Sequence, residues 1–149
     1  MTPELVAVTR ENICSFAGLY TSVFNDPPWN DGWSEKAVHE RFESFAQVPK
    51  FRGLGCHTDG KPSALVFGWG ERWVKGWHFH IKEMCVAASL QRQKTGTWLL
   101  AAFERELVAA GYQGAFLETS QSAPARDFYE KLGYNNLSHV SLAKRLRDA

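Results

Sequence analysis

The segment from Phe79 to Leu100 holds the residues whose types and order indicate chemistry most clearly. Its first half, 79–86, has the composition of a strand, 91–97 is a polar turn with a glycine, and an amphipathic helix follows. Backbone N–H groups at the start of such a helix are unpaired and lie at the positive end of its dipole, so they can accept a phosphate. Arg92 and Lys94 add positive charge there. Neither a Walker loop nor a GxGxxG motif is present. On spacing alone, a phosphate site and a plain basic turn are both open.

A second segment, from Ser122 to Tyr134, has the pattern of a short helix with defined ends. Ser122 is suited to open it, Pro124 fits its first turn, and Gly133 is suited to close it. The helix carries the aromatic pair Phe128–Tyr129. Each segment is common by itself, but the two together are not.

Taken together, the two segments resemble the GNAT superfamily of acyl-CoA-dependent N-acyltransferases. The acyl-CoA loop of that family reads Gln/Arg-x-x-Gly-x-Gly/Ala, and Gln91-x-x-Lys94-x-Gly96 lies on it. Its later signature, Asn-x-x-Ala-x-x-Phe-Tyr-x-Lys-x-Gly-Phe/Tyr, matches Ser122 through Tyr134. Lys94 replaces the first loop glycine, and Ser122 replaces the asparagine. The order of elements agrees as well, so the resemblance covers nearly the whole chain.

The resemblance implies acetyl-CoA as the co-substrate. It also implies cofactor contacts from the splayed end of a strand, from the loop and from the later signature, at Cys85, Val86, Gln91, Arg92, Gln93, Lys94, Thr95, Gly96, Thr97, Ser122 and Tyr129. Lys94 has two possible effects: it blocks a close backbone approach and weakens binding, or its ammonium contacts a phosphate. His78 and His80 have the spacing of a metal pair on a strand, but no third ligand matches them, so no metal is expected.

Acyl transfer from a thioester to an amine needs a neutral amine, donors for the oxyanion and a proton for the leaving thiolate. The resemblance implies that Tyr129 supplies that proton, as a phenol that stays protonated at neutral pH can do; simple aromatic packing is the alternative. His80 stands where several family members place a base, Glu83 is its rival, and a water chain is a third route. The family transfers the acyl group directly, so Cys85 is not expected to be a nucleophile.

Alternation along the strand at 77–86 sorts these residues onto two faces. It places His80 on one face with Lys82 and Met84, and Glu83 on the other with Cys85, unless a bulge near position 84 reorders them.

The segment after the first strand closes over the acceptor amine in the family. Here it carries aromatic and acidic side chains, at Phe24, Asp26, Trp29, Asp31 and Trp33. Such a set suits a cation through cation–π attraction and ion pairing. We therefore expect a small cationic amine, such as a polyamine, an amino sugar or an amino-acid derivative. The alternative is a proline-ordered loop whose tryptophans pack on the core while its acids are solvated. Trp69, Trp73 and Trp77, with Glu71, are candidates for the opposite wall.

Composition limits the class of protein. The chain has 149 residues, enough for one domain, with 44% hydrophobic and 22% charged residues. Its 17 basic and 16 acidic residues give a net charge of +1, so nucleic acid is not an expected partner. No apolar run approaches the roughly 20 residues of a membrane span, and no signal peptide is recognised, so no membrane partner is expected. Three distant cysteines fit a reducing cytoplasm. A homodimer is compatible with the resemblance.

Periodicity and turn residues predict the elements that must position these groups. We expect a strand at 5–8, helices at 10–24 and 34–45, strands at 51–57, 63–69 and 77–86, a helix at 98–110, a strand at 114–118, a helix at 122–133 and a strand at 137–142. The fold class is α/β (α+β), with residues 1–149 as one domain. The resemblance implies a mixed, mostly antiparallel twisted sheet of six to seven strands flanked by about four helices, in the order β-α-α-β-β-β-α-β-α-β.

The expected function is an N-acetyltransferase that transfers an acetyl group from acetyl-CoA to a small amine by direct attack. Two alternatives remain. The substitutions at Lys94 and Ser122 favour a catalytically weak acyl-CoA-binding module. A protein N-acetyltransferase would need an open groove for a peptide.

Overall fold

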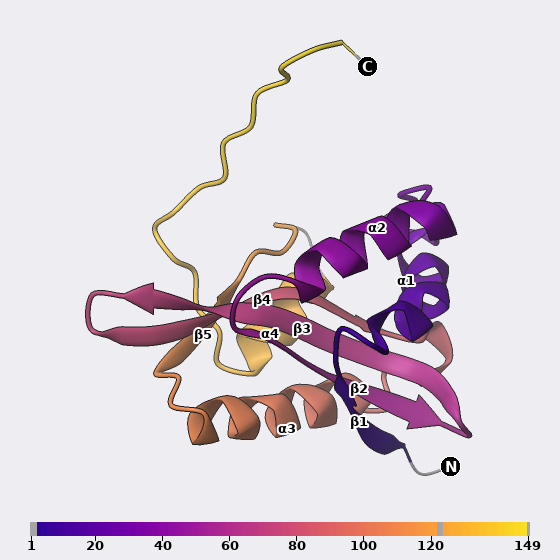
Figure 1. Ribbon diagram of the computed structural model, residues 1–149, viewed down its shortest axis with the longest axis horizontal. Helices are drawn as coiled ribbons and strands as arrows, with labels where there is room; N and C mark the ends of the chain where they lie inside the picture. Colours follow the sequence, from indigo (N-terminus) through magenta and orange to yellow (C-terminus); the bar gives the residue numbers. More distant parts are fainter. Residues whose placement is uncertain (1–2, 122–123, 149) are drawn as a thin grey trace. The chain divides into compact units, whose positions relative to one another are not determined.

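The computed structural model describes residues 3–121 and 124–148 (Figure 1). One sheet contains β1 (Glu4–Val8), β2 (Phe51–Thr58), β3 (Lys61–Trp73), β4 (Gly76–Val86) and β5 (Gly114–Leu117), in that order. The first four strands pair antiparallel, and β5 pairs parallel with β4. The α-helices are α1 (Ala17–Phe24), α2 (Glu35–Ala46), α3 (Thr95–Ala109) and α4 (Ala125–Lys131). The chain divides into two units, 1–118 and 119–149, and the first contains the whole sheet.

The mixed α/β class is confirmed, but the predicted strand count is wrong. Within the described residues the sheet has five strands rather than six or seven. The strand predicted at 137–142 does not form. A strand needs a neighbouring backbone to receive its hydrogen bonds, and in the described chain no strand pairs with this segment. The side chains of Leu137, Val140 and Leu142 are exposed.

Helices α1 and α2 cover one face of the sheet and α3 covers the other (Figure 1). On the first face the ring of Phe67 meets that of Phe42 from α2, with 5.5 Å between centroids. On the opposite face Phe79 of β4 meets Phe103 of α3 at 5.3 Å. All four rings are fully buried. The aromatic residues thus form the packing layers on both sides of the strands.

Several predicted element ends are confirmed. The Ser34 hydroxyl accepts the Ala37 N–H at 3.0 Å and caps α2. Asp59 and Gly60 both have positive φ angles, 53° and 76°, as a tight hairpin turn requires. Gly133 has φ 97°. The N–H groups of Gly133 and Tyr134 return to the carbonyls of Glu130 and Tyr129 respectively, so a Schellman motif ends α4.

Three predicted helix starts are wrong. The first helical segment begins at Ile13 as a 3-10 turn rather than at residue 10, because the Asn12 side chain bonds the backbone of Thr9 and Ala7 and holds that stretch as a turn. Helix α3 begins at Thr95 rather than 98, since the left-handed residue that precedes the helix is Lys94. Helix α4 begins at Ala125 rather than 122, and Ser122 lies outside the described residues.

Strand β3 is also longer than predicted and extends through Gly70 to Trp73. Glycine weakens a strand by propensity, which is why the pattern ends the prediction at 69. At Gly70 the missing side chain leaves room for Tyr112, since a Cβ there would collide with the Tyr112 hydroxyl. The long β3–β4 hairpin extends beyond the part of the sheet that α2 covers (Figure 1).

Candidate active site

Strand β4 has a neighbour on both sides over only part of its length. Its pairing with β5 covers His78–Ile81 and stops at Leu117, whereas its pairing with β3 continues to Val86. In the described part of the chain, no strand pairs with the β5-side edge of 82–86. Strand β4 therefore presents an open backbone edge at its end.

Hydrogen bonds decide which groups face that edge. The Ala87 N–H donates to the Ser63 carbonyl at 2.8 Å. Because successive residues of a strand direct their N–H groups to opposite sides, those of Met84 and Val86 point away from β3 and that of Cys85 points toward it. The two donors at the open edge therefore belong to Met84 and Val86, whereas the sequence pointed to Cys85 and Val86.

The loop between β4 and α3 is held by its own side chains. The Gln91 side-chain amide donates to the Val86 carbonyl at 3.0 Å, and that of Gln93 donates to the Ser89 carbonyl at 3.1 Å. Arg92 and Lys94 have left-handed φ angles of 71° and 64°. A side chain in that conformation costs roughly 1–2 kcal/mol. The backbone at Lys94 thus explains why the resembling family has glycine there.

Helix α3 begins directly after this loop. Its first N–H groups, those of residues 95–97, have no partner within the helix by geometry, and they lie at the positive end of the helix dipole. Thr95 and Gly96 are buried, while the side chains of Arg92 and Lys94 are exposed. This end of the helix combines backbone donors with two cations, which suits an anionic group.

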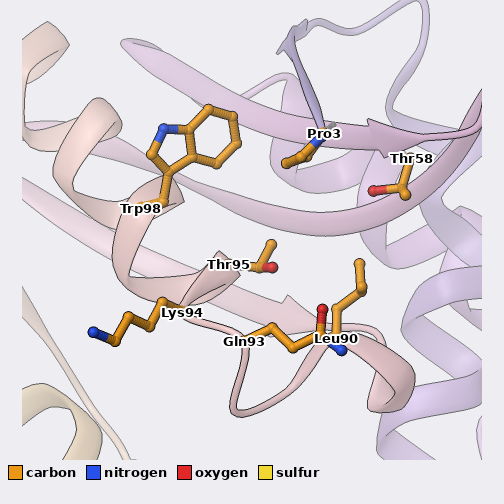
Figure 2. A pocket seen from close by; sticks show the side chains of 7 residues that line it. All are labelled: Pro3, Thr58, Leu90, Gln93, Lys94, Thr95 and Trp98. Atoms are coloured by element: carbon orange, nitrogen blue, oxygen red, sulfur yellow. The ribbon is translucent and has the colours of Figure 1, made fainter. Parts of the chain in front are cut away.

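A pocket of about 430 Å³ lies beside the loop. Figure 2 shows its seven lining side chains, with Pro3 and Thr58 across from the start of α3 and Lys94 extending away from them. The lining residues are Pro3, Thr58, Leu90, Gln93, Lys94, Thr95 and Trp98. The pocket therefore lies between the start of α3 and the residues at the ends of β1 and β2, and none of the residues 82–86 at the open edge of β4 lines it.

A bulge in β4 corrects the predicted alternation of its side chains. Phe67 stands opposite Glu83 and Gly68 stands opposite Ile81, so Lys82 is an extra residue. Glycine is required at 68, because a Cβ there would collide with the carbonyl oxygen of His80. The inserted residue changes the phase of the strand, so Glu83 faces α1 and α2. Its side chain therefore lies on the same face of the sheet as His80.

Glu83 is engaged by residues of both covering helices. The Tyr20 hydroxyl of α1 donates to its Oε2, and Arg41 Nε of α2 lies 3.2 Å from the same oxygen. The Glu83 side chain is 13% exposed. Burial, followed by the neighbouring charge of Glu83, raises the pKa of Tyr20 well above its usual value, so the phenol stays a donor. This pairing makes Glu83 a structural anchor and weakens its candidacy as a base.

Arg41 also connects Glu83 to the loop between α1 and α2, which we call the acceptor loop. Its guanidinium lies over the rings of Trp33 and Phe45, at 5.3 and 4.7 Å from their centroids. Neither Tyr20 nor Arg41 is predicted as a site residue from the sequence. A tyrosine within the apolar stripe of one helix and an arginine beside Phe42 in the next are the signals that point to them.

His80 lies farther along the same face in a different setting. Its ring is stacked on Phe116 of β5, with centroids 4.6 Å apart and 13° between planes, and meets the edge of Trp69 at 5.5 Å. Nδ1 lies 3.5 Å from Glu71 Oε2, and Nε2 lies 3.5 Å from Glu118 Oε1. The side chain of His80 is 13% exposed. Glu118 follows β5 directly, and the sequence alone does not single it out.

The acceptor loop between α1 and α2 is ordered by one asparagine. The Asn25 side chain donates to the Trp33 carbonyl at 2.9 Å and accepts the Trp33 N–H at 2.7 Å. The Trp33 indole donates to Asp31 at 3.1 Å, and Trp29 packs against Phe24 at 5.2 Å. Asp26 and Asp31 are exposed. Phe24 and Trp33 are thus partly buried, while Trp29 and the two acids are exposed.

The other tryptophans divide between the two faces of the β3–β4 hairpin. Trp69 and Trp73 pack near His80 and His78 respectively. Trp77 instead lies under the Lys50 ammonium, 4.9 Å from its centroid. Since Trp77 pairs with Arg72, between Glu71 and Trp73, alternation places it on the opposite face. The wall suggested by the sequence therefore contains Trp69 and Trp73 with Glu71, but not Trp77.

The cysteines are free thiols. Burial raises the pKa of Cys56 to about 11. Burial and then the charge of Glu83 raise that of Cys85 above its usual range. A thiol acts as a nucleophile through its thiolate, so neither residue is suited to that role.

The second unit, 119–149, contains Tyr129 on α4. Its half-buried ring meets Phe128 at 5.1 Å and Tyr134 at 5.8 Å, all within this unit. Arg126 lies 3.6 Å from Glu130 on the same helix. The predicted contact residue Ser122 lies outside the described residues.

The described residues contain neither a metal-binding cluster nor a membrane-spanning helix. No group of three or more His, Cys, Asp or Glu side chains is arranged to hold a metal ion. No helix is long and apolar enough to cross a membrane.

Comparison with known proteins places this geometry in a family. The sequence profile described as Acetyltransferase (GNAT) family matches residues 18–134. No curated protein sequence matches the chain.

Solved structures resemble the chain over almost its full length. An integron cassette protein from the mobile metagenome of V. cholerae has a TM-score of 0.80 at 13% identity, covering 99% of this chain and 94% of that one. A ribosomal-protein-alanine N-acetyltransferase from Brucella melitensis has a TM-score of 0.76 at 14% identity, covering 98% and 100%. An aminoglycoside N-acetyltransferase in complex with CoA has a TM-score of 0.75 at 15% identity, covering 98% and 96%. At these identities the likeness shows a shared fold.

Proposed function

The chain belongs to the GNAT acetyltransferase family, and from that premise we propose that it transfers an acetyl group from acetyl-CoA to a primary amine of a small cationic acceptor. The observation that carries the proposal is the open edge of β4 at 82–86, which leads into the loop and the N-terminus of α3. Backbone donors at a strand edge suit the oxygen of the acyl group and the amides of the pantetheine arm. A helix start with two cations suits phosphates.

The chain's own groups suit acetyl-CoA as the co-substrate. The N–H groups of Met84 and Val86 would bond the acyl and pantetheine oxygens. Residues 91–97 would hold the pyrophosphate through their backbone, with Arg92 and Lys94 adding charge. Tyr129 and Ser122 remain proposed contacts through the family signature. The bound co-substrate supplies the thioester that the amine attacks.

Two protons leave the acceptor in the proposed reaction. His80 takes one proton from the acceptor ammonium and later releases it to solvent. The amine nitrogen bonds the acetyl carbon, and the carbon–sulfur bond breaks. Tyr129 donates its proton to the thiolate and regains one, by way of solvent, from the reacting nitrogen. The acceptor thus loses two protons, of which one ends on the thiol of CoA and one in solvent.

Two kinds of observation support a cationic acceptor. The face of the sheet around His80 carries carboxylates beside aromatic rings, Glu71 and Glu118 with Trp69 and Phe116. The acceptor loop adds Asp26 and Asp31 beside Phe24, Trp29 and Trp33. Several of the similar solved structures are aminoglycoside acetyltransferases, and aminoglycosides carry several amino groups.

Calorimetric titration with acetyl-CoA tests the first step. Micromolar affinity, about −8 kcal/mol, is expected. Release of free CoA is then followed with a panel of amines that begins with diamines, polyamines and amino sugars. Turnover that is lost in Tyr129→Phe, with acetyl-CoA affinity retained, supports the proposal. Binding of acetyl-CoA without turnover of any amine contradicts it.

One feature of the loop favours a second candidate, a catalytically weak acyl-CoA-binding module. Lys94 has a left-handed backbone that disfavours side chains, and a side chain there can restrict the approach of a phosphate. This candidate predicts acetyl-CoA binding that Tyr129→Phe leaves unchanged and no turnover with small amines. A protein acceptor, as named for the ribosomal-protein-alanine N-acetyltransferase, is tested by adding peptides to the panel.

A further inference from the structure

Rings from both neighbouring strands hold the side chain of His80. Phe116 of β5 covers one face of the imidazole, and Trp69 of β3 stands at its edge. A ring packed in this way cannot turn freely about its side-chain torsions. Its two nitrogens therefore point in two set directions.

A carboxylate oxygen lies 3.5 Å from each of these nitrogens, Glu71 at Nδ1 and Glu118 at Nε2. The two glutamates approach from opposite sides of β4, because Glu71 is on β3 and Glu118 follows β5. The other titratable groups close by on the strand are His78 and Lys82, two residues away in each direction. A carboxylate beside one ring nitrogen can accept a hydrogen bond from its N–H and so select which nitrogen of a neutral imidazole carries the proton.

The two carboxylates differ in their surroundings. Glu71 is within a strand and its side chain is 40% exposed, whereas that of Glu118 is 66% exposed. Glu118 also lies where the pairing of β4 with β5 ends. Nε2 therefore faces the open edge, and Nδ1 faces the sheet. An acceptor that approaches His80 from solvent meets the more exposed Glu118 first.

Resting on the proposed N-acetyltransferase function, we propose that Glu71 is a positioning residue for His80 and that Glu118 binds the acceptor's ammonium group. Glu71 accepts a hydrogen bond from Nδ1–H and so leaves Nε2 as the basic nitrogen. Glu118 holds the ammonium beside Nε2. One N–H bond of the ammonium breaks, and an N–H bond forms at Nε2. The products are a neutral amine and an imidazolium that bears a proton on each nitrogen.

Kinetics of two matched variants separate the two roles. With 1,4-diaminobutane as the acceptor, Glu71→Gln is expected to lower kcat about tenfold, as loss of a supporting hydrogen bond typically does. It should leave the KM of the diamine within about twofold. Glu118→Gln is expected to raise the KM of the diamine about tenfold and to leave kcat within about twofold. Glu106→Gln is the control, because Glu106 is also 40% exposed but pairs with Arg52, away from His80.

A measurement on the protein without substrates keeps this test separate from the proposed function. The imidazole nitrogen signals of His80, assigned by comparison with His80→Gln, show by NMR which ring nitrogen carries the proton. The form protonated at Nδ1 should predominate in the parent and in Glu106→Gln, and the form protonated at Nε2 should gain population in Glu71→Gln. An unchanged ratio of the two forms in Glu71→Gln overturns the positioning role. A diamine KM unchanged in Glu118→Gln overturns the anchoring role. If the parent acetylates no amine although this ratio changes as expected, the positioning of His80 is supported and the proposed function fails.

Discussion

Glu83 and His80 lie three residues apart on β4 and face the same side of the sheet, yet their surroundings differ. Glu83 lies under α1 and α2, where Tyr20 and Arg41 engage it. His80 lies farther toward the hairpin, between Trp69 and Phe116, with two partly exposed carboxylates beside it. The two candidate bases, each with a side chain that is 13% exposed, are thus distinguished by their partners. Glu83 pairs with groups of the two covering helices, whereas His80 lies beside two carboxylates that are more exposed than itself.

Removing the partner of Glu83 should have the largest effect. Arg41→Ala leaves the Glu83 carboxylate without its ion-pair partner, and breaking a buried pair costs about 3–5 kcal/mol. Because the Arg41 side chain is 28% exposed, we expect about 3 kcal/mol of lost stability in urea unfolding. The double variant Arg41→Met with Glu83→Gln, which removes both charges, should recover part of it. A loss under about 0.5 kcal/mol would show that Glu83 is solvated rather than covered.

Replacing His80 should affect rate more than stability. His80→Gln removes the proposed base, and loss of a general base typically costs about 10²–10⁴ in rate. We expect kcat to fall about 100-fold, with a smaller loss of stability than in Glu83→Gln. Glu83→Gln is the matched variant, and its main effect should be on stability. Equal losses of kcat in the two variants would contradict the assignment of roles.

The shared orientation of His80 and Glu83 depends on the bulge at Lys82, and Gly68→Ala should disrupt that bulge. A Cβ at 68 collides with the His80 carbonyl, so the two strands must move apart. We expect a loss of about 2 kcal/mol, typical of backbone strain within a sheet, and a lower kcat, because Glu83 and His80 lose their shared face. Gly18→Ala is the control, because nothing lies within 4 Å of a Cβ there. Equal stability of the two variants would show that the bulge tolerates a side chain.

A smaller effect is expected from a change in the loop between β4 and α3, which contains neither His80 nor Glu83. Lys94→Gly removes a side chain from a left-handed position and should stabilise the protein by about 1 kcal/mol. If the lysine hinders the backbone approach, acetyl-CoA affinity should also rise, and if its ammonium contacts a phosphate, affinity should fall. Calorimetry of Lys94→Gly beside Lys94→Ala separates the two effects. A thermal midpoint no higher in Lys94→Gly than in Lys94→Ala would contradict the strain at this position.

The smallest effect is confined to alkaline pH. The pKa of Tyr20 is raised from its ordinary value of 10.0 by burial and by Glu83. A raised pKa in the folded state means that the unfolded tyrosine ionises first, so this contribution to stability is full below pH 10 and declines above it. Urea midpoints measured from pH 9 to 11 should therefore fall more steeply for the parent than for Tyr20→Phe. Parallel curves would exclude the shift.

Local signals in the sequence account for most of the element ends. The Ser34 cap, the turn at Asp59–Gly60 and the helix end at Gly133 each require only a few neighbouring residues, and all three are confirmed. The strand predicted at 137–142 does not form, because a strand depends on a pairing partner, and such a partner can lie far away in the sequence. The two glycines of β3 are likewise explained only by distant residues, Gly70 by Tyr112 and Gly68 by the His80 carbonyl.

The sequence by itself determined the family, the loop before α3 and the candidates His80, Glu83 and Tyr129, because these depend on residue types at fixed spacing. Only the tertiary structure decided how His80 and Glu83 are placed. The one-residue bulge in β4 directs both side chains to the same face of the sheet. The packing of α1 and α2 brings Tyr20 and Arg41 into contact with Glu83. The two glutamates at His80 come from β3 and from the end of β5, 47 positions apart in the chain (Glu71 to Glu118). Contacts between residues so far apart arise from strand register, which no local pattern specifies.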